Sequence, residues 1–155
     1  MLINLVYMSA ATRDFDSFEL TALLAKAREK NSRLDVTGML VYHDDAFLQV
    51  LEGHEPAVQS LYDRIKLDDR HTNCTVLLRS FIDQRNFGEW TMGFVNTKLY
   101  GPKTLPGFSD FFGRRFDAEA FKKNSAIAQK LLLGFRDGQW RQAVDHGAPT
   151  QVATI

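Results

Sequence analysis

One glutamine, Gln49, stands among apolar residues in a stretch that the sequence predicts to be a strand hairpin, residues 36–53. The alternation of side chains places Phe47, Gln49 and Leu51 on one face of the second strand. A buried primary amide that finds no hydrogen-bond partner costs about 1–3 kcal/mol. The hairpin therefore needs a polar group opposite Gln49, which a bound ligand or a neighbouring group of the protein can supply.

The composition limits the classes of function open to the chain. Its 155 residues and 17.7 kDa suffice for one well-buried core and are too few for two ordinary domains. The 19 basic and 19 acidic residues cancel, which argues against a nucleic-acid partner. A single cysteine, Cys74, excludes an internal disulfide and favours a cytoplasmic location. Residues 1–10 are apolar but too short to span a membrane, and they lack the charged leading region of a signal peptide.

The spacing of apolar residues predicts an α+β fold with the element order β-α-β-β-α-β-β. Asp16 and Glu19 form a capping-box pattern before the first helix, and Pro56 suits the first turn of the second. The expected strands cover residues 2–8, 36–42, 47–53, 73–81 and 90–95. A ferredoxin-like sheet with both helices on one face is the economical topology for this order.

The C-terminal part of the chain is predicted to cover the other face of that sheet. We expect a domain of residues 1–96, a helical extension of residues 97–146 and a flexible tail of residues 147–155. Apolar residues recur at near-helical spacing between residues 118 and 135. They are compatible with packing on the back of the sheet and equally with self-association into a homo-oligomer.

Familiar catalytic and metal-binding patterns are missing from the sequence. The four histidines have no metal-like spacing, and paired carboxylates occur only in predicted turns. The polar residues expected to point inward are Tyr7 on the first strand, Asn31 near the end of the first helix, and Gln49. In a ferredoxin-like fold the first and third strands are adjacent, so these three side chains can meet beneath the helices.

These three residues lie in motifs that resemble the BLUF family, blue-light sensors that use FAD. The motifs are LVYMS at residues 5–9, Asn31, VTGML at 36–40, FLQVLEG at 47–53, LYDRI at 61–65, DDRH at 68–71 and FGEWTMGF at 87–94. The resemblance covers residues 2–95 in unbroken order. It implies a flavin site with non-covalently bound FAD and no metal.

The resemblance also implies roles for individual residues. Tyr7 matches the redox-active tyrosine of the family, Gln49 its switching glutamine, and Asn31 the asparagine that bonds the edge of the flavin ring. Arg64 matches a basic residue near the flavin carbonyl. Three further positions match contacts to the ring or the ribityl-phosphate groups: Lys30, Asp68 and His71.

Two residues of the expected fifth strand, Trp90 and Met92, match a family pair placed near the glutamine. Because they are two positions apart, the sequence predicts that both lie on one face. The sequence does not decide which of the two faces the flavin.

The leading hypothesis is a stand-alone blue-light receptor that is not an enzyme. Light would draw an electron and a proton from Tyr7 to the flavin, and their return would leave the hydrogen bonds of Gln49 rearranged. Strand five and the C-terminal helices would then signal to a downstream protein partner. The alternatives are a catalytic flavoprotein and a flavin-free ferredoxin-like regulatory module.

Overall fold

Residues with alternating apolar side chains form one mixed sheet, and two amphipathic stretches between them form helices. The computed structural model describes residues 1–88, 90–96, 128–130, 132–134 and 152–153. Its elements are β1 (Leu2–Ala11), α1 (Ser17–Leu34), β2 (Thr37–His43), β3 (Ala46–His54), α2 (Glu55–Ile65), β4 (His71–Ile82), β5 (Gly93–Asn96) and β6 (Val152–Ala153). Residues 128–130 and 132–134 are helical as well. The first seven elements confirm the predicted order.

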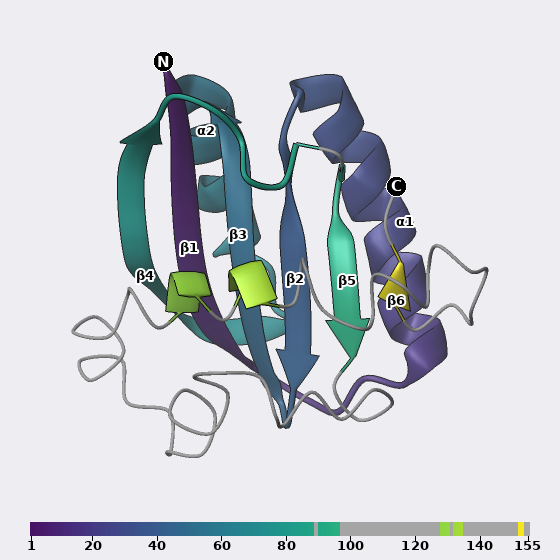
Figure 1. Cartoon of the computed structure of the whole chain (residues 1–155). Coiled ribbons are helices and arrows are strands. Elements are labelled where there is room, and N and C mark those ends of the chain that lie inside the picture. The colour runs from purple at the N-terminus through teal and green to yellow at the C-terminus, as the bar shows by residue number, and fades with distance from the viewer. Residues whose placement is uncertain (89, 97–127, 131, 135–151, 154–155) are drawn as a thin grey trace.

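The strand order in the sheet is β4-β1-β3-β2-β5-β6 (Figure 1). β1 pairs antiparallel with both β3 and β4, and β5 extends the sheet beyond β2 in the parallel direction. The first four strands of this order have the ferredoxin-like arrangement. The register places Tyr7 directly opposite Gln49, so the predicted adjacency of the first and third strands is confirmed.

α1 begins where the capping box predicts. Asp16 accepts a hydrogen bond from the backbone N–H of Glu19 at 2.7 Å, and the Glu19 side chain accepts one from the N–H of Asp16 at 3.2 Å. Asn31 is the last buried residue of the helix, which continues to Leu34 and ends at Asp35 in the left-handed conformation with φ 53°. The buried stripe of α1 therefore ends at Asn31, as the sequence predicts.

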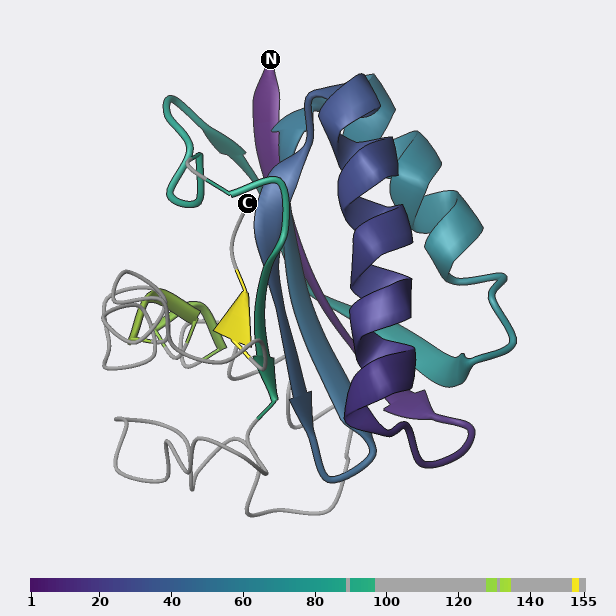
Figure 2. The ribbon, with the colours of Figure 1, turned by 90° about the vertical axis from the view of Figure 1, so that its right-hand side faces the viewer.

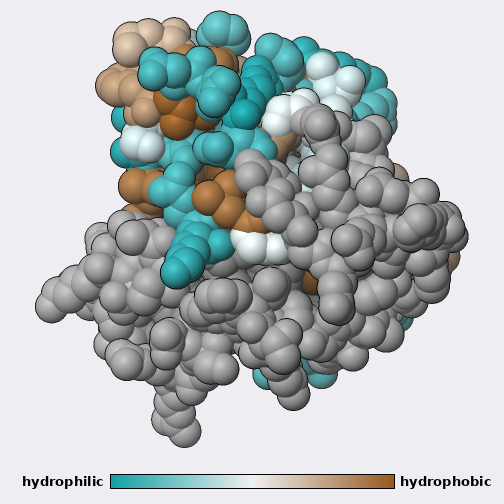
Figure 3. Space-filling view, in the orientation of Figure 1, coloured by the Kyte–Doolittle hydropathy of each residue, from teal (hydrophilic) through white to brown (hydrophobic). Residues whose placement is uncertain are grey.

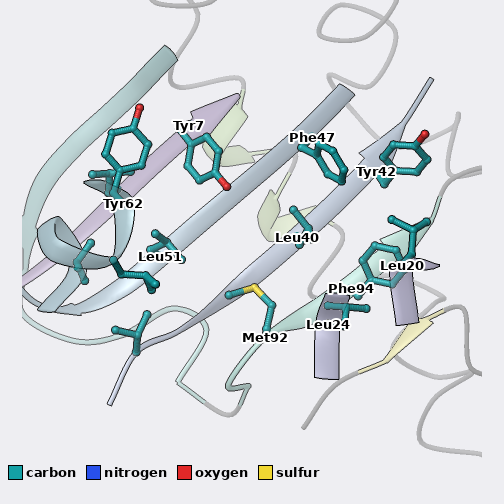
Figure 4. Packing of buried hydrophobic residues seen from close by; sticks show 14 of the residues in the cluster. Tyr7, Leu20, Leu24, Leu40, Tyr42, Phe47, Leu51, Tyr62, Met92 and Phe94 are labelled. Atoms are coloured by element: carbon teal, nitrogen blue, oxygen red, sulfur yellow. The ribbon is translucent and has the colours of Figure 1, made fainter. Parts of the chain in front are cut away.

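α1 and α2 lie on the same side of the sheet, here called the front face (Figure 2). The front apolar cluster fills the space between the sheet and the helices, and Figure 4 shows part of it. Its buried members are Ile3, Leu5, Tyr7, Phe15, Leu20, Leu24, Val36, Leu40, Tyr42, Phe47, Leu51, Val58, Leu61, Tyr62, Met92 and Phe94.

A second apolar cluster lies on the opposite, back face of the sheet. Its buried members are Val6, Met8, Met39, Val41, Leu48, Val50, Leu77, Phe87, Trp90, Val95, Ala128 and Leu132. The alternation predicted for β3 is confirmed, since Phe47 and Leu51 belong to the front cluster while Leu48 and Val50 belong to the back cluster. The upper, described part of the surface on this side is mostly hydrophilic (Figure 3).

Described residues of the C-terminal part pack on the back face. Ala128 and Leu132 are 0% and 1% exposed within the back cluster, and their helix lies on the side of the sheet away from α1 and α2 (Figure 2). Most of the predicted extension, residues 97–127 and 135–146, lies outside the described residues.

Val152 and Ala153, which fall within the predicted tail of residues 147–155, form β6 and pair antiparallel with β5, while the rest of that segment lies outside the described residues. The free edge of β5 offers main-chain N–H and C=O groups, and pairing with them does not require apolar side chains.

The predicted placement of Trp90 and Met92 on one face is wrong. β5 begins at Gly93, after both residues, and Trp90 belongs to the back cluster while Met92 belongs to the front cluster. The Trp90 N–H donates to the carbonyl of Phe87 at 3.1 Å, and the Trp90 carbonyl accepts from Gly38 N–H at 3.1 Å. Trp90 is thus held in a turn before the strand, where the two-residue period of a strand does not apply.

A buried carboxylate fixes the segment that leads into this turn. Glu52 is 0% exposed, and its side chain accepts hydrogen bonds from the backbone N–H groups of Asn86 at 3.1 Å and Phe87 at 2.8 Å. Burial raises the pKa of Glu52, while these two N–H groups and the charge of Arg85 act in the opposite direction. Glu52 therefore ties the chain beyond β4 to the back of β3.

We predict that Glu52→Gln destabilises the fold by about 2 kcal/mol, because one acceptor oxygen becomes an NH₂ donor that faces a buried N–H. The free energy of unfolding in urea measures this. The control is Glu29→Gln, which removes an exposed ion pair with Arg33 and should cost under about 0.5 kcal/mol. Equal losses in the two variants would contradict the role given to Glu52.

Candidate cofactor pocket

A cavity of about 310 Å³ opens between α1, α2 and the front face of the sheet. Its walls are largely apolar, and its size lies within the usual range of small-molecule sites. The lining residues are Tyr7, Leu23, Lys26, Ala27, Lys30, Asn31, Leu40, Phe47, Gln49, Leu61, Arg64, Ile65, Asp68, Arg70 and His71. The cavity therefore brings together every predicted site residue except Trp90 and Met92.

Tyr7 and Gln49 are joined at the floor of this cavity. The Tyr7 hydroxyl donates a hydrogen bond to Gln49 Oε1, and both residues are buried. Burial raises the pKa of Tyr7 well above its ordinary value of 10.0, and nearby Cys74, Tyr62 and Asp68 act in the same direction. Tyr7 is therefore a protonated phenol at neutral pH, and its proton points at the amide oxygen.

The other end of the Gln49 amide is engaged by Met92. Gln49 Nε2 donates to Met92 Sδ at 3.3 Å, and Met92 is 0% exposed. A thioether sulfur is a weak acceptor, so the amide has a strong partner at its oxygen and a weak one at its nitrogen. The structure thus places Met92, and not Trp90, beside Gln49. Figure 4 shows Met92 among the other apolar side chains of the front cluster.

Asn31 lines the cavity from α1 and is 2% exposed. Its Nδ2 donates to the main-chain carbonyl of Thr91 at 3.0 Å. Asn31 is therefore joined to the segment before β5 as well as to the cavity, a contact that the sequence did not indicate.

The rim of the cavity carries more positive than negative charge. Four exposed cationic residues lie there, Lys26, Lys30, Arg64 and Arg70, against Asp68 as the one carboxylate among the described lining residues. Lys26 and Arg70 were not among the predicted site residues. The position of Lys26, one helical turn before Lys30, is the pattern that could have identified it.

His71 is fixed at the edge of the cavity by two hydrogen bonds. Its Nε2 lies 2.6 Å from the carbonyl of Ile65, and its Nδ1 lies 2.8 Å from Ser9 Oγ. Because a carbonyl oxygen can only accept, Nε2 carries a proton, and in the neutral ring Nδ1 accepts from the Ser9 hydroxyl. Both ring nitrogens are therefore used within the protein.

These features fit a flavin. An isoalloxazine ring is flat, with a hydrocarbon end and an edge of carbonyl and nitrogen groups, so it suits an apolar slot that has amide groups at its floor. The cationic rim suits the phosphate of a ribityl chain. Within the described part of the chain there is no cluster of three or more metal-ligating side chains, and no helix there is long and apolar enough to cross a bilayer.

The fold and the site define a small α+β domain with a largely apolar cavity that suits a flat cofactor. Residues 2–93 match the model of the BLUF family, described as sensors of blue-light using FAD. The chain belongs to the BLUF family, and this region is a flavin-binding, blue-light-sensing domain.

Photoactivated adenylate cyclase subunit beta of Euglena longa is 37% identical over 110 residues, which are 70% of this chain and 13% of that protein. The blue light- and temperature-regulated antirepressor BluF of Escherichia coli (strain K12) is 33% identical over 100 residues, which are 64% of this chain and 25% of that protein. The chain spans only a small part of these curated relatives.

Solved structures have the same fold. The BlsA ground state matches with a TM-score of 0.70 and 28% identity, over 86% of this chain and 88% of that chain. The dark-state structure of BlrB, a BLUF protein, matches with a TM-score of 0.65 and 26% identity, over 83% and 96% of the two chains. The predicted family and α+β fold are confirmed.

A partly buried ion pair shapes the mouth of the cavity. Arg70 donates from Nε to Asp68 Oδ1 at 2.9 Å and from Nη2 to Oδ2 at 2.5 Å. These bonds are the main reason that the pKa of Asp68 is lowered from 3.8 to about 2. The carboxylate is therefore ionised at neutral pH and holds one of the rim cations in place.

We predict that Arg70→Gln returns the pKa of Asp68 toward 3.8. Because the folded-state pKa lies below the unfolded value, the pair stabilises the protein above pH 4 or so and loses this effect as the pH falls toward about 2. The loss in the variant should be under about 1 kcal/mol near neutral pH, since both side chains contact water. Urea unfolding across this pH range measures the difference, with Arg33→Gln as an exposed control. A difference that does not change with pH would contradict the assignment.

Proposed function

We propose that this domain binds FAD non-covalently and signals blue light through a rearrangement of the Gln49 side chain. The observation that carries the proposal is the buried hydrogen bond from Tyr7 to Gln49 at the floor of the cavity. When bound, the flavin supplies blue-light absorption and an excited state that can oxidise a nearby phenol. The cationic rim supports a phosphate-bearing flavin, and the family description supports FAD.

Tyr7 is the electron and proton donor in this proposal. Its raised pKa keeps the hydroxyl proton in place until an electron leaves the ring. The electron and the proton both return to Tyr7, so no net oxidation remains. The lasting change is in the hydrogen bonds of Gln49.

Gln49 is suited to this role because its two ends differ. In the structure its oxygen accepts from Tyr7, and its nitrogen donates to Met92. Turning or tautomerising the amide exchanges a donor for an acceptor at both places. Met92 and Tyr7 would then each face the opposite kind of hydrogen-bonding group, with almost no change in the volume of the side chain.

Asn31, Arg64, Lys30, Asp68 and His71 are the remaining residues proposed to hold the flavin. Asn31 would bond the edge of the ring from the floor of the cavity, and Arg64 a ring carbonyl. Lys30 would contact the phosphate at the rim, while Asp68 and His71 would shape the mouth where the ribityl chain leaves.

Signalling would pass to a protein partner along the segment from Trp90 and Met92 into β5 and the C-terminal helices. The support is that Trp90 shares the back cluster with Ala128 and Leu132, while Met92 contacts Gln49 on the front. A partner responds only if it binds the dark and lit states with different affinity. We propose a sensor without catalytic activity, located in the cytoplasm, with residues 97–146 as its output extension and 147–155 as its tail.

The first test is the absorption spectrum. We predict that the purified protein is yellow, releases FAD on denaturation, and shows a small red shift under blue light that reverses in darkness. Gln49→Leu should retain the flavin and lose the shift, because leucine fills the volume without an amide. Gln59→Leu on α2 is the control, since Gln59 bonds only Asp63 among the described residues and should shift normally. A normal shift in Gln49→Leu would contradict the switching role.

The second test concerns the electron donor. We predict that Tyr7→Phe binds flavin and loses the reversible shift, since phenylalanine keeps the ring packing but has no hydroxyl proton. Tyr62→Phe is a matched control, because its ring lies 5.2 Å from that of Tyr7 in the same cluster. Wild-type photochemistry in Tyr7→Phe would mean that another residue is the donor.

A further inference from the structure

α1 holds two consecutive carbonyl groups of the segment that precedes β5. Asn31 Nδ2 donates to the carbonyl of Thr91 at 3.0 Å, and Arg28 Nε donates to the carbonyl of Met92 at 3.1 Å. Arg28 and Asn31 are three positions apart and so project from the same side of the helix. The segment that carries Met92 is thus attached to α1 and not only to the sheet.

The Arg28 contact is unusual for a surface helix. Burial lowers the pKa of Arg28, and its Nη2 is buried without a hydrogen-bond partner in the described part of the chain. Thr91 Oγ1 is buried without one as well. No carboxylate of the described residues forms an ion pair with Arg28. Its Nε instead donates to the main-chain carbonyl of Met92, in the segment before β5.

We propose that Arg28 is a positioning residue that holds Met92 against Gln49 and thereby sets the lifetime of the lit state. This inference rests on the proposed function. Met92 accepts two hydrogen bonds, one at its main-chain carbonyl from Arg28 and one at its sulfur from Gln49 Nε2. A group that fixes the main chain of Met92 also fixes the place of the sulfur.

The direction of the effect follows from the arrangement in the structure. Met92 accepts from the nitrogen of Gln49 in the arrangement that also has Tyr7 donating to its oxygen. Turning the amide replaces that N–H donor with an oxygen, which the sulfur cannot bond. Because Arg28 keeps the sulfur in place, it favours the return of the amide to its dark orientation, and loss of Arg28 should slow that return.

The test compares Arg28→Ala, Arg28→Lys and the control Arg33→Ala, which removes an exposed pair with Glu29 on the same helix. After a blue pulse, Arg28→Ala should recover about tenfold more slowly than wild type, the range expected for one hydrogen bond to a charged group. Arg28→Lys retains a charged donor and should recover part of the rate. Arg33→Ala should stay within about twofold of wild type.

A double-mutant cycle with Met92→Leu separates positioning from a general loss of stability. If Arg28 acts through Met92, Arg28→Ala should change recovery far less in the Met92→Leu background than in wild type. Additive effects of the two substitutions would overturn the proposal. So would a recovery rate within about twofold of wild type in both Arg28 variants.

Hydrogen exchange in the dark gives a readout that does not depend on the photocycle. The amides of residues 91–94 should exchange faster in Arg28→Ala, while those of β1 should stay unchanged. Unchanged exchange at residues 91–94 would overturn the positioning role. A wild-type protein that binds flavin but shows no light-induced shift would refute the proposed function. The hydrogen-exchange result would still test, independently, whether Arg28 holds the main chain at Met92.

Discussion

The hydrogen bond from Tyr7 to Gln49 is the interaction on which the site depends. It crosses from β1 to β3 at the centre of the sheet, where the register places the two residues opposite each other. A buried phenol and a buried amide would each be costly alone, and together they satisfy one another. The bond therefore explains why the front cluster tolerates these two polar groups. The Gln49 nitrogen, which among the described residues bonds only the weak acceptor Met92 Sδ, is the less firmly held end of the amide.

The sheet divides the molecule into two apolar clusters, and the segment before β5 contacts both. Glu52 holds Phe87 from the back, while Asn31 and Arg28 hold the following residues from the front. Gly38 anchors the same segment by donating its N–H to the carbonyl of Trp90, and a Cβ at Gly38 would stand 2.0 Å from the carbonyl oxygen of Val50, so only glycine lets β2 lie this close to β3. A rearrangement of Gln49 therefore acts on a segment that is held at Phe87 from the back face and at Thr91 and Met92 from the front face.

Local patterns predicted much of this structure. The capping box at Asp16, the position of Pro56 and the alternation around Gln49 each depend on residues close in sequence, and each was confirmed. The face taken by Trp90 could not be predicted in this way. Its position depends on main-chain bonds to Phe87 and Gly38, and the second of these joins residues far apart in the chain.

The contacts of α1 with the segment before β5 escaped sequence reasoning for a related reason. An arginine at the edge of a helix is usually a solvated residue, and its sequence neighbourhood does not reveal that its Nε meets a carbonyl 64 positions away. The amphipathic pattern identified Asn31 as an inward residue but not its bond to Thr91. Hydrogen bonds between a side chain and a distant stretch of irregular main chain produce no periodic pattern in the sequence from which they could be predicted.

The distribution of charge shows why net charge is a poor guide to this site. The chain has no net charge, which argues against nucleic acid, yet cationic side chains predominate at the mouth of the cavity. Exposed charges interact mainly within about 10 Å at ordinary salt, so an anionic tail responds to the rim and not to the total. Asp68 fixes Arg70 in one orientation through their ion pair, whereas Lys26, Lys30 and Arg64 form no ion pair within the described residues. A site with one oriented cation and three unpaired ones can bind a phosphate on a flexible chain without dictating a single path for it.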